Sequence, residues 1–256
     1  MQVATRGRLH PISVAIREIA DIFGRMGFSI SYGPELETDW YNFTALNIPP
    51  NHPARSMQDT FWIKDRPDSV LRTHTTAVTA RELELMAKEG KTEMRKIFPG
   101  KTFRNEATDI THEAQFYQLD GFAVGSTGTI TLAHLKYTLE RFYREYLGES
   151  AKVRFRPSFF GFTEPSVEVD AWFQPPGKEG KWLEMCGGGM IHPAVFQNAS
   201  LDSAKIQGFA WGGGLERMLM VKYGIPDVRL FHSGDVRFIY GFLPDRQAGD
   251  EKIETV

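Results

Sequence analysis

Long segments of this chain place apolar residues at intervals of three and four, the spacing of a helix that buries one side. The first predicted helix covers residues 10–26 and stops at Gly27, and a second covers residues 128–146. Two further helices are predicted at residues 74–89 and 214–224, each followed or ended by a glycine. The apolar stripe of the first helix consists of Ile12, Ile16, Ile19, Phe23 and Met26.

Other segments carry the alternation of apolar and polar residues that is typical of strands. Residues 167–173 place Val and Ala on one side and Glu168, Asp170 and Trp172 on the other. Residues 181–185 follow after a Pro/Gly-rich turn, so the two segments predict an antiparallel hairpin. A second hairpin is predicted from residues 101–106 and 115–124, joined by a polar loop. Shorter strands are predicted at residues 28–32, 70–73 and 152–156.

Composition narrows the class of protein. The chain is 41% hydrophobic and 24% charged, with 24 glycines, as expected of a soluble globular protein with many turns. No apolar run is long enough to cross a bilayer, so we expect a cytoplasmic protein. Cys186 is the only cysteine, which excludes an internal disulfide and a zinc cluster of cysteines. We expect one domain over residues 1–242 and a polar C-terminal tail over residues 243–256.

The net charge of −2 lacks the basic excess of a protein that holds nucleic acid by itself. If the chain binds RNA, most of the contacts that hold the RNA must come from outside this chain.

The predicted hairpin at residues 101–124 carries polar side chains that an ordinary core strand would lack. Arg104 and Glu106 are two apart and should share a face, and an arginine fork matches a phosphate. The alternative is a surface salt bridge between these two residues. His112, Gln118 and Asp120 bring further polar groups to the loop and the return strand.

This stretch, FRNEATDITHEAQFYQLDG, resembles the second signature motif of class II aminoacyl-tRNA synthetases, and more narrowly that of phenylalanyl-tRNA synthetase α subunits. The resemblance implies that Arg104 holds the ATP α-phosphate, that Glu106 contacts the adenine side and that His112 helps to bind the triphosphate. It also implies that Gln118 and Asp120 fix the ammonium of the amino acid. The family usually has Glu where this chain has Asp120.

The other two class II motifs are matched as well. Residues 10–34, a helix, a glycine stop and a strand, resemble the first motif, which forms a subunit interface in the family. GFAWGGGLERMLMVKYGI resembles the third motif, in which Arg217 would brace the far end of ATP. The glycine run alone is weak evidence, because the Lys-Ser/Thr of a phosphate-binding P-loop is missing.

Two segments have both a structural and a functional interpretation. LRTHTT is either a helix-capping cluster or, by the resemblance, the place where His74 and Thr76 contact the substrate amino acid. The family often has serine at the position of Thr76. Phe160 and Phe162 are either core residues or the pair that sandwiches the ring of phenylalanine.

The resemblance adds three residues to these segments. Thr163 extends the match after Phe162, and Ala210 would form the floor of the ring pocket. Glu164 corresponds to a magnesium ligand of the family. Glu184 is either a second carboxylate near the phosphates or the cross-strand partner of a lysine, and the spacing does not decide between them.

The resemblance implies an α+β fold, with a mostly antiparallel sheet flanked by helices. It implies activation of L-phenylalanine by ATP with Mg²⁺ and transfer to tRNA(Phe), in an assembly of two α and two β subunits. The family's N-terminal arm, which embraces tRNA, is not in this sequence, so we expect strong dependence on the β subunit. An enzyme for another amino acid would need a polar residue at Phe160 or Phe162, and a non-enzymatic paralogue would typically have lost Arg104 or Arg217.

Overall fold

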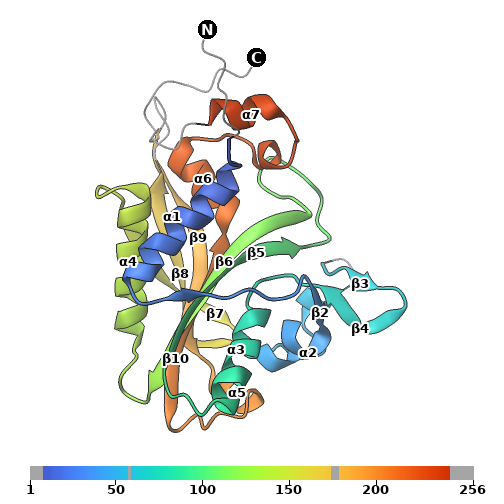
Figure 1. Ribbon diagram of the computed structural model, residues 1–256, viewed down its shortest axis with the longest axis vertical. Coiled ribbons are helices and arrows are strands. Elements are labelled where there is room, and N and C mark those ends of the chain that lie inside the picture. The colour runs from blue at the N-terminus through green and yellow to red at the C-terminus, as the bar shows by residue number, and fades with distance from the viewer. Residues whose placement is uncertain (1–7, 57–58, 174–178, 243–256) are drawn as a thin grey trace.

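The computed structural model describes residues 8–56, 59–173 and 179–242 (Figure 1). The predicted polar tail at residues 243–256 lies outside the described residues. The centre of the fold is a seven-stranded sheet in the order β1-β5-β6-β10-β9-β8-β7, in which only β1 and β5 pair in parallel. Its strands are β1 (Ser29–Ile30), β5 (Met94–Phe103), β6 (Gln115–Ser126), β7 (Val153–Phe160), β8 (Thr163–Phe173), β9 (Lys181–Ile191) and β10 (Ile206–Gly214). The expected α+β fold with a mostly antiparallel sheet is confirmed.

A three-stranded sheet in the order β2-β4-β3 lies beside the large one (Figure 1). Its strands are β2 (Leu36–Thr38), β3 (Trp62–Ile63) and β4 (Arg66–Leu71).

Helices cover both faces of the large sheet. One face carries α1 (Pro11–Arg25), α4 (Leu132–Leu147) and α6 (Leu215–Tyr223), which share a hydrophobic cluster with the sheet. The other face carries α3 (Ala77–Lys88), α5 (Pro193–Asn198) and the short helices α2 (Asp39–Asn42) and η1 (Thr44–Leu46). Three short helices complete the described chain, namely η2 (Pro53–Arg55), η3 (Val228–Phe231) and α7 (Val236–Gly241). No helix in the described chain is long and apolar enough to span a bilayer.

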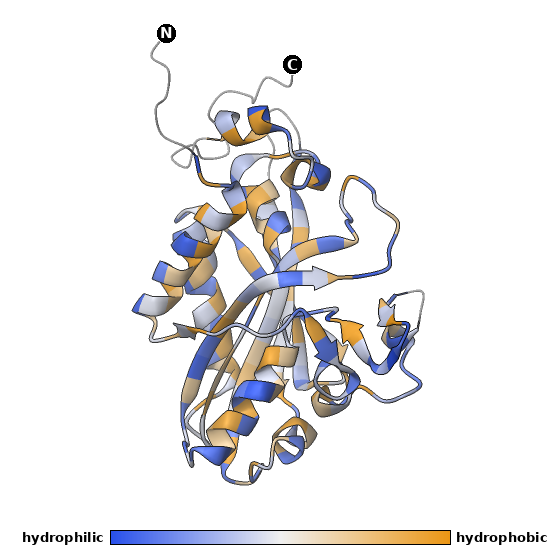
Figure 2. Cartoon of the chain, turned by 45° about the vertical axis from the view of Figure 1, so that its right-hand side comes forward, coloured by the Kyte–Doolittle hydropathy of each residue, from blue (hydrophilic) through white to orange (hydrophobic). Residues whose placement is uncertain are grey.

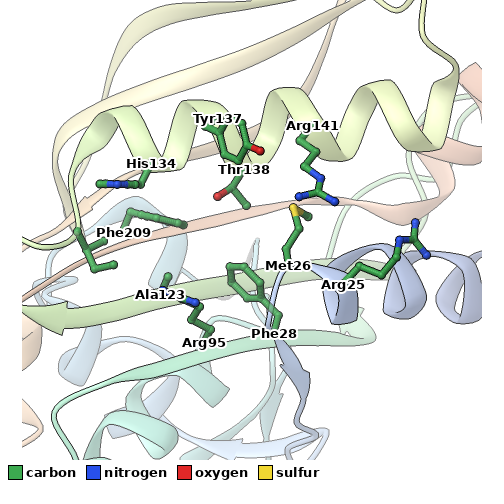
Figure 3. Close-up of a pocket in the computed structure, with 11 residues that line it drawn as sticks. Arg25, Met26, Phe28, Arg95, Ala123, His134, Tyr137, Thr138, Arg141 and Phe209 are labelled. Atoms are coloured by element: carbon green, nitrogen blue, oxygen red, sulfur yellow. The ribbon is translucent and has the colours of Figure 1, made fainter.

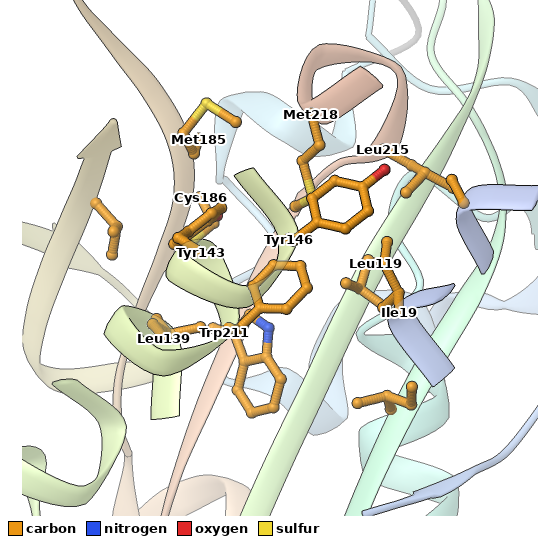
Figure 4. Packing of buried hydrophobic residues seen from close by; sticks show 14 of the residues in the cluster. Ile19, Leu119, Leu139, Tyr143, Tyr146, Met185, Cys186, Trp211, Leu215 and Met218 are labelled. Carbon is orange, nitrogen blue, oxygen red and sulfur yellow. The ribbon is translucent and has the colours of Figure 1, made fainter. Parts of the chain in front are cut away.

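The larger hydrophobic cluster is organised around Trp211 of β10 (Figure 4). Its ring stacks on Phe23 of α1 at 5.3 Å between centroids. Gly121 of the neighbouring strand makes room for it, since a Cβ there would lie 2.6 Å from the Trp211 ring. Cys186 is buried in the same cluster, and this burial raises the pKa of its thiol to about 12. The lone cysteine is therefore an inert packing residue.

The helix predictions are largely confirmed. Helix α1 has the predicted stripe, with Ile12, Ile19 and Phe23 buried, and Gly27 follows it with φ of 82°. Helix α4 starts four residues later than residue 128, because Thr131 forms a capping box at Leu132.

The predicted first strand of the central hairpin is misplaced. The strand covers Met94–Phe103 rather than residues 101–106, because Ile97 and Phe98 are its buried residues. Arg104 and Glu106 therefore lie beyond the strand, in a connecting loop that is largely hydrophilic (Figure 2). The loop is closed where Arg104 N donates to the carbonyl of Ala114 at 2.9 Å.

Candidate active site

A strip of glycines runs across the two central strands of the large sheet. Gly212 of β10 pairs with Gly187 of β9, and Ala210 pairs with Gly189. Side chains alternate along a strand, so these positions share the face opposite α1, α4 and α6. A Cβ at Gly212 would lie 2.4 Å from a carboxylate oxygen of Asp120, and one at Gly187 would lie 2.6 Å from the Phe160 ring. The glycines therefore let a ligand or a side chain approach the sheet backbone closely.

A buried carboxylate borders this strip. Asp120 of β6 is only 1% exposed, and Thr76 Oγ1 donates to its Oδ2 at 2.5 Å. Its Oδ1 meets the geometric limits of a hydrogen bond with no residue that the structure describes, although the nearby Thr75 hydroxyl helps to lower the pKa of Asp120. Burial raises the pKa of Asp120 to about 6. A cationic group placed beside Oδ1 would satisfy this oxygen and favour the ionised form.

Further buried polar atoms near Asp120 form no hydrogen bond with any residue in the described part of the chain. They are both ring nitrogens of His74, Oγ1 of Thr75 and Oε1 of Gln118. Burial, and next the charge of Arg104, lower the pKa of His74 to about 3, so its ring is neutral at pH 7. Since buried polar atoms are nearly always paired in proteins, this concentration indicates a place for a polar ligand.

Arg104 is fixed by its surroundings rather than by a strand. Its Nε donates to the carbonyl of Thr73 at 3.2 Å, and its guanidinium lies over the ring of Phe116 at 5.0 Å. Nη1 of Arg104 is 3.9 Å from Oε1 of Glu106, and both side chains are more than a third exposed. The salt bridge considered for this pair is therefore present, but it is long and weak.

His112 lies in the loop between β5 and β6, away from the buried cluster. Its Nδ1 is 3.0 Å from Oδ2 of Asp109, and both side chains are at least half exposed. The Asp109 carboxylate accepts from the backbone N–H groups of Thr111 and His112. The first of these bonds is the largest cause that lowers the pKa of Asp109. The loop is also tied to the C-terminal part, because Val228 N donates to the carbonyl of Ile110.

The first turn of α6 links three parts of the site. Glu216 is 2% exposed and accepts from the backbone N–H of Tyr117 at 2.7 Å, so it anchors α6 to β6. His232 Nε2 lies 3.2 Å from the same carboxylate. Arg217 is exposed, and its Nη1 donates to the carbonyl of Glu184 at 3.0 Å. Arg217 therefore reaches across β9 at one end of the glycine strip.

Glu184 forms no ion pair with a lysine that the structure describes. It faces Asp170 across the β8–β9 pair and forms no ion pair among the residues that the structure describes. Arg217 contacts the backbone carbonyl of Glu184, and the interpretation of this exposed side chain as a carboxylate near the phosphates stays a prediction.

Glu164 and Glu184 do not share one metal ion. Glu164 is 75% exposed and lies 3.6 Å from His192, at the opposite end of β8 from the residue that faces Glu184. Six residues of strand separate these positions, which is roughly 20 Å. No group of three or more His, Cys, Asp or Glu suited to a metal occurs in the described part of the chain. Mg²⁺ is commonly held by one or two carboxylates together with substrate phosphates, and Glu184 beside Arg217 fits that arrangement.

Phe160 and Phe162 do not share a strand, because β7 ends at Phe160 and β8 begins at Thr163. Their rings nevertheless stack, with centroids 5.6 Å apart and an interplanar angle of 13°. At this separation the rings contact each other, so a ligand ring fits beside the pair rather than between its members. Phe162 packs against the hydrophobic cluster that contains Ala210, which is 5% exposed. An apolar wall and the buried carboxylate thus lie on the same face.

Thr163 is engaged in the turn. Its Oγ1 lies 2.8 Å from Oγ of Ser166, and Ser166 in turn donates to the Thr163 carbonyl. Asn47 Nδ2 donates to the carbonyl of Gly161 at 2.6 Å and holds the same turn. Thr163 therefore shapes the turn that presents the two rings.

The sequence reasoning missed two groups on this face. Arg72 is 4% exposed, donates to the carbonyls of Lys101 and Gly33, and lies above Gly100. An arginine directly after the apolar pair Val70-Leu71 was the available signal. Arg156 donates two hydrogen bonds to Asp170, which is also bound by Arg154. The predicted alternation placed Asp170 on this face but gave no sign of its arginine partners.

The family model described as tRNA synthetases class II core domain (F) matches residues 1–242. The chain belongs to this family. It is 49% identical over 249 residues to the phenylalanine–tRNA ligase alpha subunit of Bartonella tribocorum, covering 93% of this chain and 67% of the relative. It is 48% identical to the alpha subunits of a Methylobacterium species and of Brucella suis, covering 94% of this chain and 68% and 69% of those relatives. Over most of its length this synthetase core is therefore similar to proteins that are all named as alpha subunits of phenylalanine–tRNA ligases.

Proposed function

We propose that this chain is the catalytic α subunit of a phenylalanine–tRNA ligase, which activates L-phenylalanine with ATP and transfers it to tRNA(Phe). The observation that carries the proposal is the Asp120 carboxylate with its unpartnered Oδ1, on the sheet face that also carries the apolar wall of Phe160, Phe162 and Ala210. An α-amino acid with an aromatic side chain offers a matching ammonium and ring. The wall offers no polar partner for a substituent on that ring.

In this proposal the amino acid is held by neutral and acidic groups from two elements. Asp120 and Gln118 of β6 accept from the substrate ammonium, since a carboxylate and an amide oxygen are its natural partners. His74 and Thr76 lie beside them, at the start of α3. Because the imidazole of His74 is neutral, it can contact the substrate amino acid without repelling the substrate ammonium.

ATP would lie along the glycine strip between two arginines. Arg104 contacts the α-phosphate, and Arg217 contacts the distal phosphates beside Glu184. Glu106 and His112 belong to the same loop as Arg104 and bind the adenine side and the triphosphate. Bound Mg²⁺ supplies neutralisation of the phosphate charge, with Glu184 as the carboxylate near the phosphates and Glu164 as a separate exposed candidate.

The reaction needs no nucleophile from the protein. A carboxylate oxygen of phenylalanine attacks the α-phosphorus and pyrophosphate leaves, and a terminal hydroxyl of tRNA then attacks the carbonyl and AMP leaves. Arg104 acts by positioning the α-phosphate and by stabilising the charge that develops on its oxygens. We further propose that a β subunit completes the assembly and supplies most of the tRNA contacts, and that the enzyme is cytoplasmic.

The test is ATP–pyrophosphate exchange by the purified α–β complex with each of the twenty amino acids. We expect exchange with phenylalanine alone, and its loss in Asp120→Asn. Exchange with a different amino acid would overturn the substrate assignment, and no exchange with any would favour a non-enzymatic paralogue.

A further inference from the structure

A cavity of about 290 Å³ lies behind the sheet, on the face that α1 and α4 cover (Figure 3). Its floor is apolar and includes Phe28, Ala123 and Phe209, each of which is at most 8% exposed. Side chains alternate between the two faces along β6, so Ala123 lies on the face opposite Asp120 and Phe122. The cavity and the glycine strip therefore lie on opposite faces of the sheet. The cavity is therefore separate from the proposed active site.

Three arginines from three elements border this cavity. They are Arg25 of α1, Arg95 of β5 and Arg141 of α4. Arg25 and Arg141 share the carboxylate of Glu145, at 2.6 and 2.8 Å. Arg95 is exposed and forms no ion pair within the described chain. The border thus carries more positive than negative charge, and the residues that line the cavity, all of them described, include no carboxylate.

Neutral donors complete the border. Thr138 is 8% exposed, and Tyr137 stands beside it on α4 (Figure 3). His134 uses Nδ1 in the capping box of α4, so its Nε2 is the nitrogen left for a ligand. An apolar floor with cationic and hydroxyl groups on one border is typical of a site for a small amphipathic molecule.

We propose that this cavity binds a small organic anion with an apolar body, such as a medium-chain carboxylate. The apolar body packs on Phe28 and Phe209, and the carboxylate bonds with Arg95 and Arg141. An arginine can bind a carboxylate through two parallel N–H donors, which gives the site its preference for this group. A polyphosphate is disfavoured, because it would bury its charge against the apolar floor without pairing.

The probe is octanoate, which has no ring to compete for the proposed phenylalanine site, and octanamide is its uncharged match. Each is titrated into the full chain by isothermal titration calorimetry, with the Phe28 and Phe209 ring signals followed by NMR. We expect saturable binding of octanoate at one site per chain, and binding of octanamide weaker by about tenfold or more. Arg95→Gln should weaken octanoate binding by a similar factor, since Arg95 forms no ion pair with a described residue that the substitution would break.

Arg66→Gln is the matched control, because Arg66 is an exposed arginine of β4 outside the cavity. It should leave octanoate binding unchanged. Equal binding of octanamide, an equal effect of the two substitutions, or an absence of saturation would each overturn the proposal. The titration is repeated with the α–β complex. Retained binding supports a ligand site, whereas loss of binding assigns the cavity to the subunit interface and overturns it.

Discussion

Thr76 Oγ1 donates a hydrogen bond to Oδ2 of Asp120 at 2.5 Å, and so joins two positions at which, by the resemblance, this chain differs from the usual family residues. The resemblance implies that the family often has serine at the first position and usually has glutamate at the second. Threonine adds one methyl group and aspartate removes one methylene, so the two changes nearly conserve volume across the contact.

Substitution of the pair tests whether these changes are coupled. Asp120→Glu alone should raise the KM for phenylalanine several-fold, because the Asp120 carboxylate already fills the space above Gly212. Thr76→Ser alone should change the KM for phenylalanine only slightly. In the double variant it should reverse part of the increase in KM that Asp120→Glu causes. The measurement is ATP–pyrophosphate exchange over the double-mutant cycle. Strictly additive effects would show that the two sites act independently.

Asp120→Asn should separate stability from function. The pKa of Asp120 is raised from 3.8 to about 6, so the folded chain binds this proton more tightly than the unfolded chain. Stability contributed by the site is therefore full below about pH 4 and is lost as pH rises to about 6, at a cost of up to about 3 kcal/mol. As pH rises from about 4 to about 6, the free energy of unfolding measured with urea should fall for the wild type but not for Asp120→Asn. The variant should nevertheless lose exchange activity. A difference that does not change with pH would contradict the raised pKa.

Arg104→Ala should reduce adenylate formation by about 100-fold or more, because a donor aimed at developing charge is lost. Arg104→Lys should also be impaired, since lysine cannot reproduce the arginine fork. Exchange kinetics measure both variants, and circular dichroism checks that the fold is intact. Arg66→Ala serves as the control at an exposed arginine of the small sheet. Wild-type exchange in Arg104→Ala would remove Arg104 from the reaction.

Ala210→Gly should admit phenylalanine analogues that are enlarged at the para position. Ala210 is 5% exposed in the cluster that Phe162 packs against, so loss of its methyl group deepens that wall. Activation of para-chlorophenylalanine is the measurement. Tyrosine should remain disfavoured, because its buried hydroxyl would lack a partner at a cost of about 1–3 kcal/mol. If Ala210→Gly activates para-chlorophenylalanine no better than the wild type does, Ala210 does not limit the size of the ring pocket.

The isolated chain should be a poor aminoacylating enzyme. Its net charge of −2 offers little attraction for a polyanion, so the tRNA contacts must come largely from a partner. Adding the β chain should restore charging of tRNA(Phe), measured as the initial rate of aminoacylation. The same β chain with Arg104→Ala shows whether the restored activity uses this active site. Charging by the α chain alone at a rate typical of synthetases would refute the dependence.

The sequence by itself determined the elements and the chemistry of the motifs. Helix α1 follows its apolar stripe, the strand from Ile206 ends in a helix at Leu215, and the β8–β9 hairpin follows the alternation. These signals are local, because spacing along the chain sets which side of an element is buried. The motif residues were found in the same way, from short runs at fixed spacing.

The tertiary structure alone decided which of these residues meet. The strand before Arg104 was misplaced, because which of its residues are buried depends on contacts with distant segments. Arg104 and Glu106, which were predicted in this strand, lie in the loop that follows it. The register between β8 and β9 separated Glu164 from Glu184, although each looked like a metal ligand in sequence. Thr76 and Asp120 are 44 positions apart and came into contact only through packing of α3 against β6. Long-range pairing of this kind depends on the whole fold, and no local spacing encodes it.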